Sequence, residues 1–277
     1  MSLRALAWLA VAALLATTAA AATPEPKGPD WRRVDSENAL VIETNRGRII
    51  VEMSPEAAPR HVAQIKILAR QKVYDGLTFF RVIDWFMDQT GDPKNTGEGA
   101  SSLPNLKAEF TFRRAAGTPF VPVAAPMGAE EGLVGSLPVF SQTSALMKLT
   151  PDRQVSAWGT YCPGVAGMGR DDDPDSANSQ FFLMRHAYPS LDRRYTAWGR
   201  VVVGLEVVRA VTPGEPPPNP DRMLTVRVLA DLPEAQRPKV YVMDAKGPAF
   251  ATLLARIRRA RGADFSVCDI DLPVIVR

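Results

Sequence analysis

Short runs of apolar and β-branched residues recur along most of the chain and predict a mainly β protein. Residues 39–44 and 48–53 are two such runs, and the turn-forming tripeptide Asn-Arg-Gly between them is typical of a β-hairpin. Four later runs have the same character: residues 77–83, 180–184, 196–203 and 223–229. The order strand, strand, helix, strand at the start suits a sheet on which helices pack.

Helical spacing of apolar residues predicts three helices. Ser54 as N-cap and Pro55 at the first helical position predict a helix over residues 56–71. Residues 205–211 predict a short helix, and residues 250–261 predict a longer one that a glycine ends.

The N-terminal residues 1–22 predict a secretory signal peptide. Arg4 supplies a positive charge, residues 5–16 are apolar, and small residues follow up to the expected cleavage site. The apolar run is too short to span a bilayer comfortably, so we expect no stable membrane insertion. The protein is therefore expected to be periplasmic or secreted, with an uncleaved anchor as the alternative.

Changes in composition divide the rest of the chain. Residues 23–36 form a Pro-rich leader, and residues 37–212 form the main domain. That domain is interrupted at about 118–158 by a stretch with weak periodicity, which is typical of an insertion or a functional excursion. Residues 213–277 begin as a Pro-rich linker and continue as a C-terminal extension.

Composition places the chain among ordinary globular proteins. It has 277 residues, of which 46% are hydrophobic and 23% are charged, with 33 Lys and Arg against 30 Asp and Glu. These values exclude a disordered chain, a coiled coil and a collagen. For an exported chain with this balance of charge, we expect no nucleic acid partner.

Two charged clusters are interpreted as solvated surface. Residues 171–175 space carboxylates like the start of a calcium loop, but Ser176 and Phe182 stand where such a loop needs Gly and Glu. The four arginines within residues 256–261 predict a solvated helix face, with an acidic partner or an anionic lipid surface as the alternative. Neither histidine has the spacing of a metal ligand, so no metal is expected.

The two cysteines, Cys162 and Cys268, lie near the end of the weakly periodic stretch and in the C-terminal extension. An exported chain meets an oxidising compartment, which favours a disulfide between them. Two unpaired buried thiols are the alternative.

Candidate chemistry begins with Arg81, which interrupts the apolar run of residues 79–83. A guanidinium in such a run is costly unless it is paired or lines a cleft. A structural ion pair or an arginine that reaches the surface is the simpler explanation. However, Phe86, Met87 and Gln89 follow closely, and together with Arg81 they could form a wall that is apolar below and hydrogen-bonding above.

Residues 74–99, with the sequence YDGLTFFRVIDWFMDQTGDPKNTGEG, closely resemble the signature of cyclophilin-type peptidyl-prolyl cis-trans isomerases. Residues 176–182 (SANSQFF) resemble a second block of that family. Leu191-Asp192, followed by residues 198–202 (WGRVV), resembles a third block. The three blocks occur in the family's order.

The resemblance implies a fold and a location for the site. The family fold is a closed eight-stranded antiparallel β-barrel capped by two helices, which would be residues 56–71 and 205–211. Side chains fill the interior of such a small barrel, so the site would lie on its outer wall. Here the family pattern would carry a long insertion and a C-terminal extension.

The resemblance also implies an activity that needs no cofactor, the rotation of X–Pro bonds in proline-containing polypeptides. Arg81 matches the donor to the prolyl nitrogen of the twisted amide, and Gln89 matches the amide that hydrogen-bonds the substrate. The remaining positions that match substrate-binding residues are Phe86, Met87, Gly169, Arg170, Phe182, Leu191 and Tyr195.

Three positions depart from the family pattern. Phe80 and Tyr195 stand where the family commonly has His, and Ser190 stands where it often has Trp. Because Arg81 and the apolar pocket residues are retained, we favour an active isomerase that acts on exported proteins. A non-catalytic proline-peptide binding or chaperone module is the alternative, and a partner-binding role of the C-terminal extension is a third hypothesis.

Overall fold

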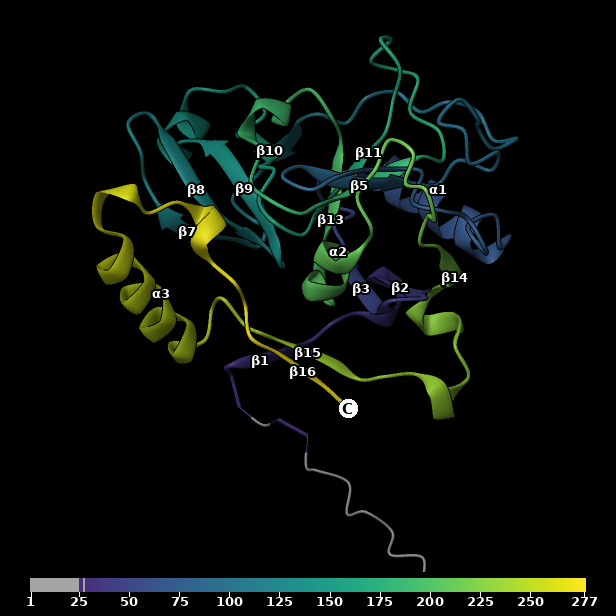
Figure 1. The fold of residues 1–277 in the computed structure, drawn as a ribbon. Coiled ribbons are helices and arrows are strands. Elements are labelled where there is room, and N and C mark those ends of the chain that lie inside the picture. The colour runs from purple at the N-terminus through teal and green to yellow at the C-terminus, as the bar shows by residue number, and fades with distance from the viewer. Residues whose placement is uncertain (1–24, 27) are drawn as a thin grey trace, which may run out of the picture.

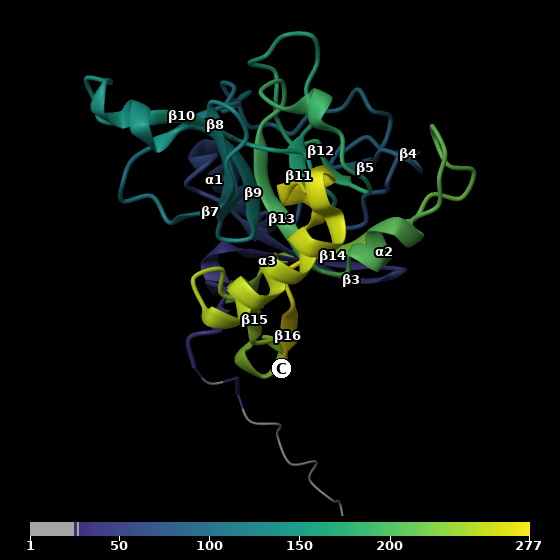
Figure 2. The ribbon, with the colours of Figure 1, turned by 90° about the vertical axis from the view of Figure 1, so that its left-hand side faces the viewer.

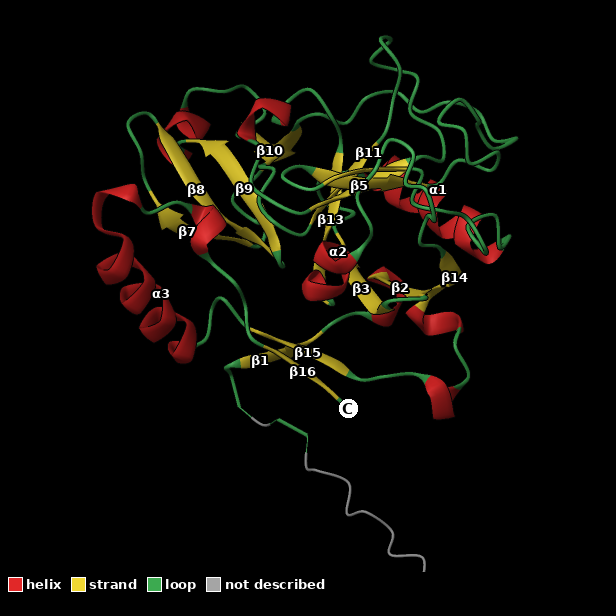
Figure 3. Ribbon diagram, in the orientation of Figure 1, coloured by secondary structure: helices red, strands yellow, loops and turns green. Residues whose placement is uncertain are grey.

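The computed structural model describes residues 25–26 and 28–277, so the expected signal peptide lies outside the described residues. Three sheets make up most of the fold: a large curled sheet, a second sheet beside it and a small sheet below them (Figure 1). Strands and loops dominate, and helices are few (Figure 3). Within the described part of the chain, no helix combines the length and the apolar character needed to cross a bilayer.

The large sheet has eight antiparallel strands in the order β14-β2-β3-β13-β11-β12-β5-β4. The expected hairpin is confirmed, because β2 and β3 pair from Ala39 opposite Glu52 to Thr44 opposite Gly47. The strands are β2 (Ala39–Thr44), β3 (Gly47–Met53), β4 (Arg81–Ile83), β5 (Met87–Thr90), β11 (Val165–Met168), β12 (Phe181–Met184), β13 (Ala197–Val203) and β14 (Met223–Val228).

The prediction that this sheet closes into a barrel is wrong, because the sheet curls into a half-barrel. Near the edge strands β4 and β14, isolated bridges join Thr78 to Arg222 and Val82 to Gly214, without a continuous ladder. The prolines that follow Gly214 lack the N–H donors that a ladder requires. The run of residues 77–83 accordingly forms a strand only over its last three residues.

Side chains of the sheet alternate between two cores. Phe181 and Leu183 of β12 pack in the core that also holds Val62 and Leu68 of the first helix. Phe182 belongs to the other core, outside the curl, together with Met87 and Met184. The period-two alternation of strands therefore places Phe182 on the outer wall of the half-barrel.

The first helix, α1 (Pro59–Arg70), begins later than expected. Ser54 accepts backbone hydrogen bonds from the N–H groups of Ala57 and Ala58, but the chain there forms turns, and Pro59 takes the first helical position. A residue before proline is disfavoured in the helical conformation, which explains the late start. The two other expected helices are confirmed as α2 (Leu205–Ala210) and α3 (Pro248–Arg261).

The weakly periodic stretch, together with a short strand just before it, forms a five-stranded antiparallel sheet in the order β6-β10-β9-β8-β7. Pro122 lies within β7, Pro138 within β9 and Gly132 within β8, and these residues obscured the strand pattern. The strands are β6 (Phe112–Arg114), β7 (Phe120–Ala124), β8 (Ala129–Val134), β9 (Leu137–Gln142) and β10 (Val155–Gly159).

A third sheet joins the two ends of the chain. Strand β15 (Val240–Met243) pairs with β1 (Trp31–Arg33) on one side and with β16 (Val274–Val276) on the other. Figure 2 shows α3 and this sheet together, with the C-terminus beside β16. Short 3-10 helices lie at Ser36–Asn38, Ser144–Lys148, Pro189–Leu191, Leu229–Asp231, Glu234–Gln236, Gly262–Asp264 and Val267–Asp269.

Two contacts tie the added segments to the half-barrel. The predicted disulfide is confirmed, since Cys162 and Cys268 are bonded with their Cα atoms 4.9 Å apart. The buried guanidinium of Arg200 on β13 donates to the carbonyl of Ser136 at 3.4 Å and to that of Ile270 at 2.9 Å. One side chain of the half-barrel thus bonds both the insertion and the C-terminal extension.

Candidate functional site

All nine residues singled out from the sequence line one cavity of about 220 Å³ on the outer wall of the half-barrel. Strands β4, β5 and β12, the turn between β4 and β5, and the loops that follow β11 and β12 supply them. The lining residues are Arg81, Phe86, Met87, Gln89, Gly169, Arg170, Phe182, Leu191 and Tyr195. The structure therefore brings together every candidate residue, and their roles stay predictions.

Arg81 lies at the polar side of this cavity, opposite Gln89 in the β4–β5 ladder. Its Nη1 donates to Oε1 of Gln89 at 3.3 Å, and its Nε donates to Oε2 of Glu215 at 2.7 Å. The side chain is 37% exposed. A charged donor is thus held at the mouth of the cavity by partners on two sides.

A chain of amide hydrogen bonds continues from Gln89 away from the arginine. The Nε2 of Gln89 donates to Oε1 of Gln180 at 3.0 Å. The Nε2 of Gln180 in turn donates to the carbonyls of Gly97 and Gly99, both at 2.9 Å. These bonds fix the orientation of the Gln89 amide, which leaves a defined hydrogen-bonding group at the cavity wall.

The loop whose carbonyls accept the hydrogen bonds from Gln180 is held in shape by the buried side chain of Asp92. Its carboxylate accepts hydrogen bonds from the N–H groups of Lys94, Thr96 and Gly97. Burial alone would raise the pKa of Asp92, but these hydrogen bonds lower it below the usual range. A carboxylate that stays ionised keeps the loop in place beneath Gln180.

The floor of the cavity is apolar and closely packed. Met87 is 2% exposed and Phe182 is 5% exposed. The ring of Phe182 stacks on Tyr161 with centroids 5.7 Å apart and meets Tyr195 edge-on at 5.9 Å. This floor offers a flat, rigid apolar surface that suits a small ring without polar groups.

The far rim of the cavity is built by Leu191, Tyr195 and Arg170. Leu191 ends the short 3-10 helix Pro189–Leu191, and the next residue, Asp192, accepts a hydrogen bond from the Tyr161 N–H at 2.9 Å. The guanidinium of Arg170 lies 4.5 Å from the centre of the Tyr195 ring. A cation above an aromatic face holds both side chains in position.

The positions that depart from the family pattern have different surroundings. Phe80 is buried beside the loop at Gly97, and Ser190 is exposed. The ring of Tyr188 packs against that of Phe86 with centroids 4.6 Å apart and the ring planes tilted by 50°. An aromatic side chain therefore supports Phe86 from a position two residues before Ser190.

Two functional candidates were not singled out from the sequence. Gln180 lies in the SQFF block, so the resemblance could have indicated it through its place beside Phe182. Glu215 lies in the Pro-rich segment interpreted as a linker, 134 positions from Arg81. No local pattern marks that long-range ion pair.

The insertion lies beside the site without lining it. Arg193, two residues beyond Leu191, places its guanidinium over the ring of Trp158 in β10. The guanidinium carbon lies 5.0 Å from the centroid of that ring. No residue of 118–158 is among those that line the cavity. Trp158 and Arg193 thus form one contact between the insertion and the rim.

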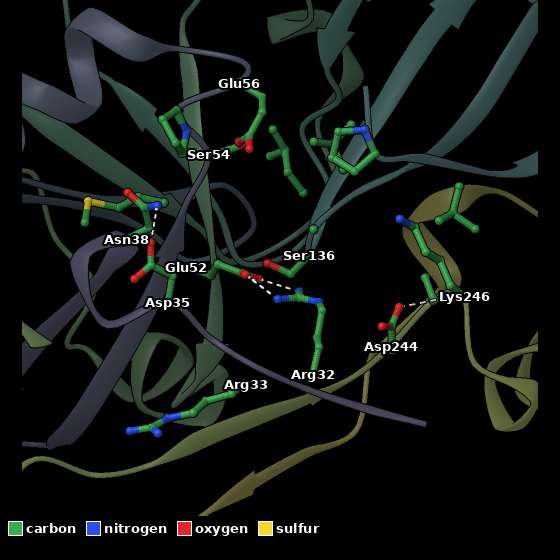
Figure 4. Close-up of a pocket in the computed structure, with 18 residues that line it drawn as sticks. Arg32, Arg33, Asp35, Asn38, Glu52, Ser54, Glu56, Ser136, Asp244 and Lys246 are labelled. Carbon is green, nitrogen blue, oxygen red and sulfur yellow. Dashed lines mark hydrogen bonds and ion pairs between the residues drawn. The ribbon is translucent and has the colours of Figure 1, made fainter. Parts of the chain in front are cut away.

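A second cavity, of about 370 Å³, lies between the half-barrel, the insertion and the C-terminal strands (Figure 4). Arg32 donates two hydrogen bonds to Glu52 at its centre, at 2.5 and 2.7 Å. Acidic and basic side chains line it together with apolar residues such as Val121 and Leu137. None of the nine candidate residues lines it.

Metal-binding clusters of three or more His, Cys, Asp or Glu side chains are absent from the described residues. His61 is buried, with Nδ1 2.7 Å from Oε2 of Glu109. Residues 171–175 form an exposed loop in which Arg170 donates to the carbonyls of Asp171 and Asp172. Both features have structural partners within the protein.

Comparisons with known proteins agree with this geometry. The family model described as "Cyclophilin type peptidyl-prolyl cis-trans isomerase/CLD" matches residues 39–228. Proteins of Brucella suis and Brucella melitensis, each named "Probable peptidyl-prolyl cis-trans isomerase", are 32% identical over 213 residues, which cover 71% of this chain and 85% of theirs.

A solved structure extends the similarity beyond the family segment. The crystal structure of a cyclophilin from Hirschia baltica matches with a TM-score of 0.83 and 36% identity, covering 89% of this chain and 93% of that one. The matching half-barrel, the family model and the Brucella relatives lead to the same conclusion: this chain belongs to the family of cyclophilin-type peptidyl-prolyl cis-trans isomerases.

Proposed function

We propose that this protein is a peptidyl-prolyl cis-trans isomerase that accelerates the rotation of X–Pro bonds in polypeptides. The observation that carries the proposal is the placement of Arg81 and Gln89 at the mouth of a cavity whose floor is formed by Met87 and Phe182. A proline ring on the apolar floor would bring the preceding peptide bond beside the guanidinium.

The geometry suits the physical barrier of this reaction. Rotation about an X–Pro bond is opposed by about 18–20 kcal/mol because resonance gives the C–N bond double-bond character. In the twisted amide, the prolyl nitrogen becomes pyramidal and regains a lone pair. An N–H donor aimed at that lone pair stabilises the transition state more than either planar ground state. Arg81 is suited to this role because its guanidinium stays charged and presents a rigid set of donors.

The remaining side chains would each hold one side of the rotating bond. The apolar floor fixes the proline ring, while the oriented amide of Gln89 bonds the backbone beside it. Rotation then needs no covalent intermediate and no proton transfer. Each 1.4 kcal/mol or so of preference for the twisted amide increases the rate about tenfold.

The test is the rate of cis-trans exchange in a short X–Pro peptide, measured with wild type, Arg81→Lys and Arg81→Ala. We expect wild type to accelerate exchange, Arg81→Ala to lower kcat/KM by about tenfold or more, and Arg81→Lys to fall between them. Circular dichroism and thermal unfolding show whether each variant keeps the fold.

The control is Arg256→Ala, since Arg256 lies on the exposed side of α3 and lines neither cavity described here. If the exchange rate with wild type equals the rate in buffer alone, the enzymatic proposal is refuted. Peptide binding without acceleration would instead establish the non-catalytic proline-binding module.

We also propose that the protein acts outside the cytoplasm, on exported polypeptides. The N-terminal sequence and the Cys162–Cys268 disulfide support this, because structural disulfides persist mainly in oxidising compartments. Expression of the full chain in a Gram-negative bacterium, followed by cell fractionation and N-terminal sequencing, tests the proposal. We expect a periplasmic protein that begins near residue 23, and a full-length cytoplasmic protein would refute it.

A further inference from the structure

The Pro-rich segment between α2 and β14 is anchored at both of its ends. The buried carboxylate of Asp221 accepts hydrogen bonds from the backbone N–H and the hydroxyl of Thr212, each at 2.8 Å. It also accepts from Asn45 at 2.6 Å and from Nε of Arg46 at 2.8 Å. The segment is therefore a loop of fixed position, held against the hairpin between β2 and β3.

A bridge then places this loop beside β4. The N–H of Val82 donates to the carbonyl of Gly214 at 2.8 Å, and the N–H of Gly214 donates to the carbonyl of Val82 at 2.9 Å. In an antiparallel bridge, the next residue of one strand lies opposite the preceding residue of the other. The register accordingly sets Glu215 opposite Arg81.

The resulting ion pair engages one defined atom of the arginine. Oε2 of Glu215 accepts from Nε of Arg81 at 2.7 Å, while Nη1 donates to Gln89. No acceptor for Nη2 of Arg81 is found among the described residues. Because the guanidinium is planar, two bonds on Nε and Nη1 fix its plane and leave Nη2 for a ligand in the cavity.

We infer that Glu215 is a positioning residue for Arg81, so that the Pro-rich loop is part of the isomerase site. This inference rests on the proposed function and deepens it. Glu215 does not line the cavity, and its effect on the reaction passes through the orientation of the guanidinium. When the donor is already oriented before the substrate binds, its side chain does not have to reorganise during the rotation, and the barrier carries no cost for that step.

The experiment compares wild type with Glu215→Ala and Glu215→Gln in the X–Pro exchange assay. We expect Glu215→Ala to lower kcat by about two- to fivefold with KM little changed, the range that a part-exposed ion pair can contribute. Glu215→Gln keeps an oxygen that can accept from Nε, so we expect partial rescue. Raising the salt concentration should slow wild type and leave Glu215→Gln unchanged, because salt screens the ion pair.

A spectroscopic measurement separates positioning from a general effect on the fold. The Nε–Hε signal of Arg81, assigned by its loss in Arg81→Ala, should exchange with water faster in Glu215→Ala than in wild type. Glu206→Ala is the matched control, because Glu206 is an exposed acidic residue nine positions earlier. We expect that variant to behave like wild type.

The outcomes separate this inference from the proposed function. If wild type is active, Arg81→Ala is impaired and Glu215→Ala keeps wild-type kcat, the positioning inference fails and the proposed function stands. An increase of kcat in Glu215→Ala would also overturn it, since the carboxylate would then be withholding Arg81 from the substrate. If wild type itself is inactive, the proposed function fails first.

Discussion

At the scale of single residues, the shape of the apolar floor depends on the missing side chain of Gly167. A β-carbon at this position would lie 2.4 Å from Cζ of Phe182 and 2.7 Å from the hydroxyl of Tyr161. Both distances are far shorter than van der Waals contact. The Phe182 ring can therefore lie flat on the strand only because residue 167 is glycine.

We expect Gly167→Ala to displace the Phe182 ring and to lower kcat/KM by about tenfold, because small misplacements of binding groups are costly in catalysis. The measurement is the X–Pro exchange rate together with the thermal midpoint. Gly117→Ala is the control, since nothing lies within 4 Å of a β-carbon there. Unchanged activity in Gly167→Ala would show that the ring position does not matter for the substrate.

The candidate site could be predicted from the sequence where its residues lie in short motifs. Arg81, Gln89 and Phe182 were found this way, and the structure gathers them with six further candidates around one cavity. The ion-pair partner of Arg81 could not be predicted. Glu215 reaches it through a backbone bridge between distant segments, and no spacing within one segment encodes that contact.

At the scale of elements, the Pro-rich loop depends on the buried carboxylate of Asp221. Burial by itself would raise the pKa of Asp221, but the hydrogen bonds from Arg46, Thr212 and Asn45 lower it to about 2. A carboxyl whose pKa is lower in the folded than in the unfolded chain stabilises the fold above about pH 4. That contribution is lost as the pH falls toward 2.

We therefore expect Asp221→Asn to lower the free energy of unfolding at pH 7 by about 1–3 kcal/mol, the cost of breaking buried hydrogen bonds to a charged group. The difference from wild type should shrink as the pH falls below 4, because wild type then loses the same contribution. Urea unfolding at pH 7, 4 and 3 measures both effects. A difference that stays constant with pH would contradict the ionised anchor, and the exposed Asp264→Asn serves as control.

Elements with regular spacing could be predicted, and those interrupted by proline or glycine could not. The hairpin of β2 and β3 is as expected, because its β-branched residues and its turn all favour the same structure. The strands of the insertion were missed because prolines lie inside β7 and β9. Pairing with neighbouring strands stabilises these segments as strands although their prolines disfavour that conformation. The sequence of one segment does not indicate which other segment it will pair with.

At the scale of the whole molecule, the Cys162–Cys268 disulfide closes a loop with a sequence separation of 106. A cross-link of this span restricts the unfolded chain, and the expected stabilisation is about 4–5 kcal/mol. We expect the double variant Cys162→Ala and Cys268→Ala to unfold at a lower guanidinium concentration than wild type. Reductant should lower the midpoint of wild type and leave that of the variant unchanged, and a reductant-insensitive wild type would refute the cross-link in solution.

The buried guanidinium of Arg200 has a consequence for dividing this chain into modules. Its hydrogen-bond acceptors are a carbonyl of the insertion and a carbonyl beyond residue 228, where the family match ends. A protein trimmed to the family segment would keep this cation and its bond to Ser136 but lose the shorter bond to Ile270, and a buried charge with fewer hydrogen bonds is costly in a fold. We therefore expect the smallest version of this protein that folds on its own to include residues that the family pattern alone would discard.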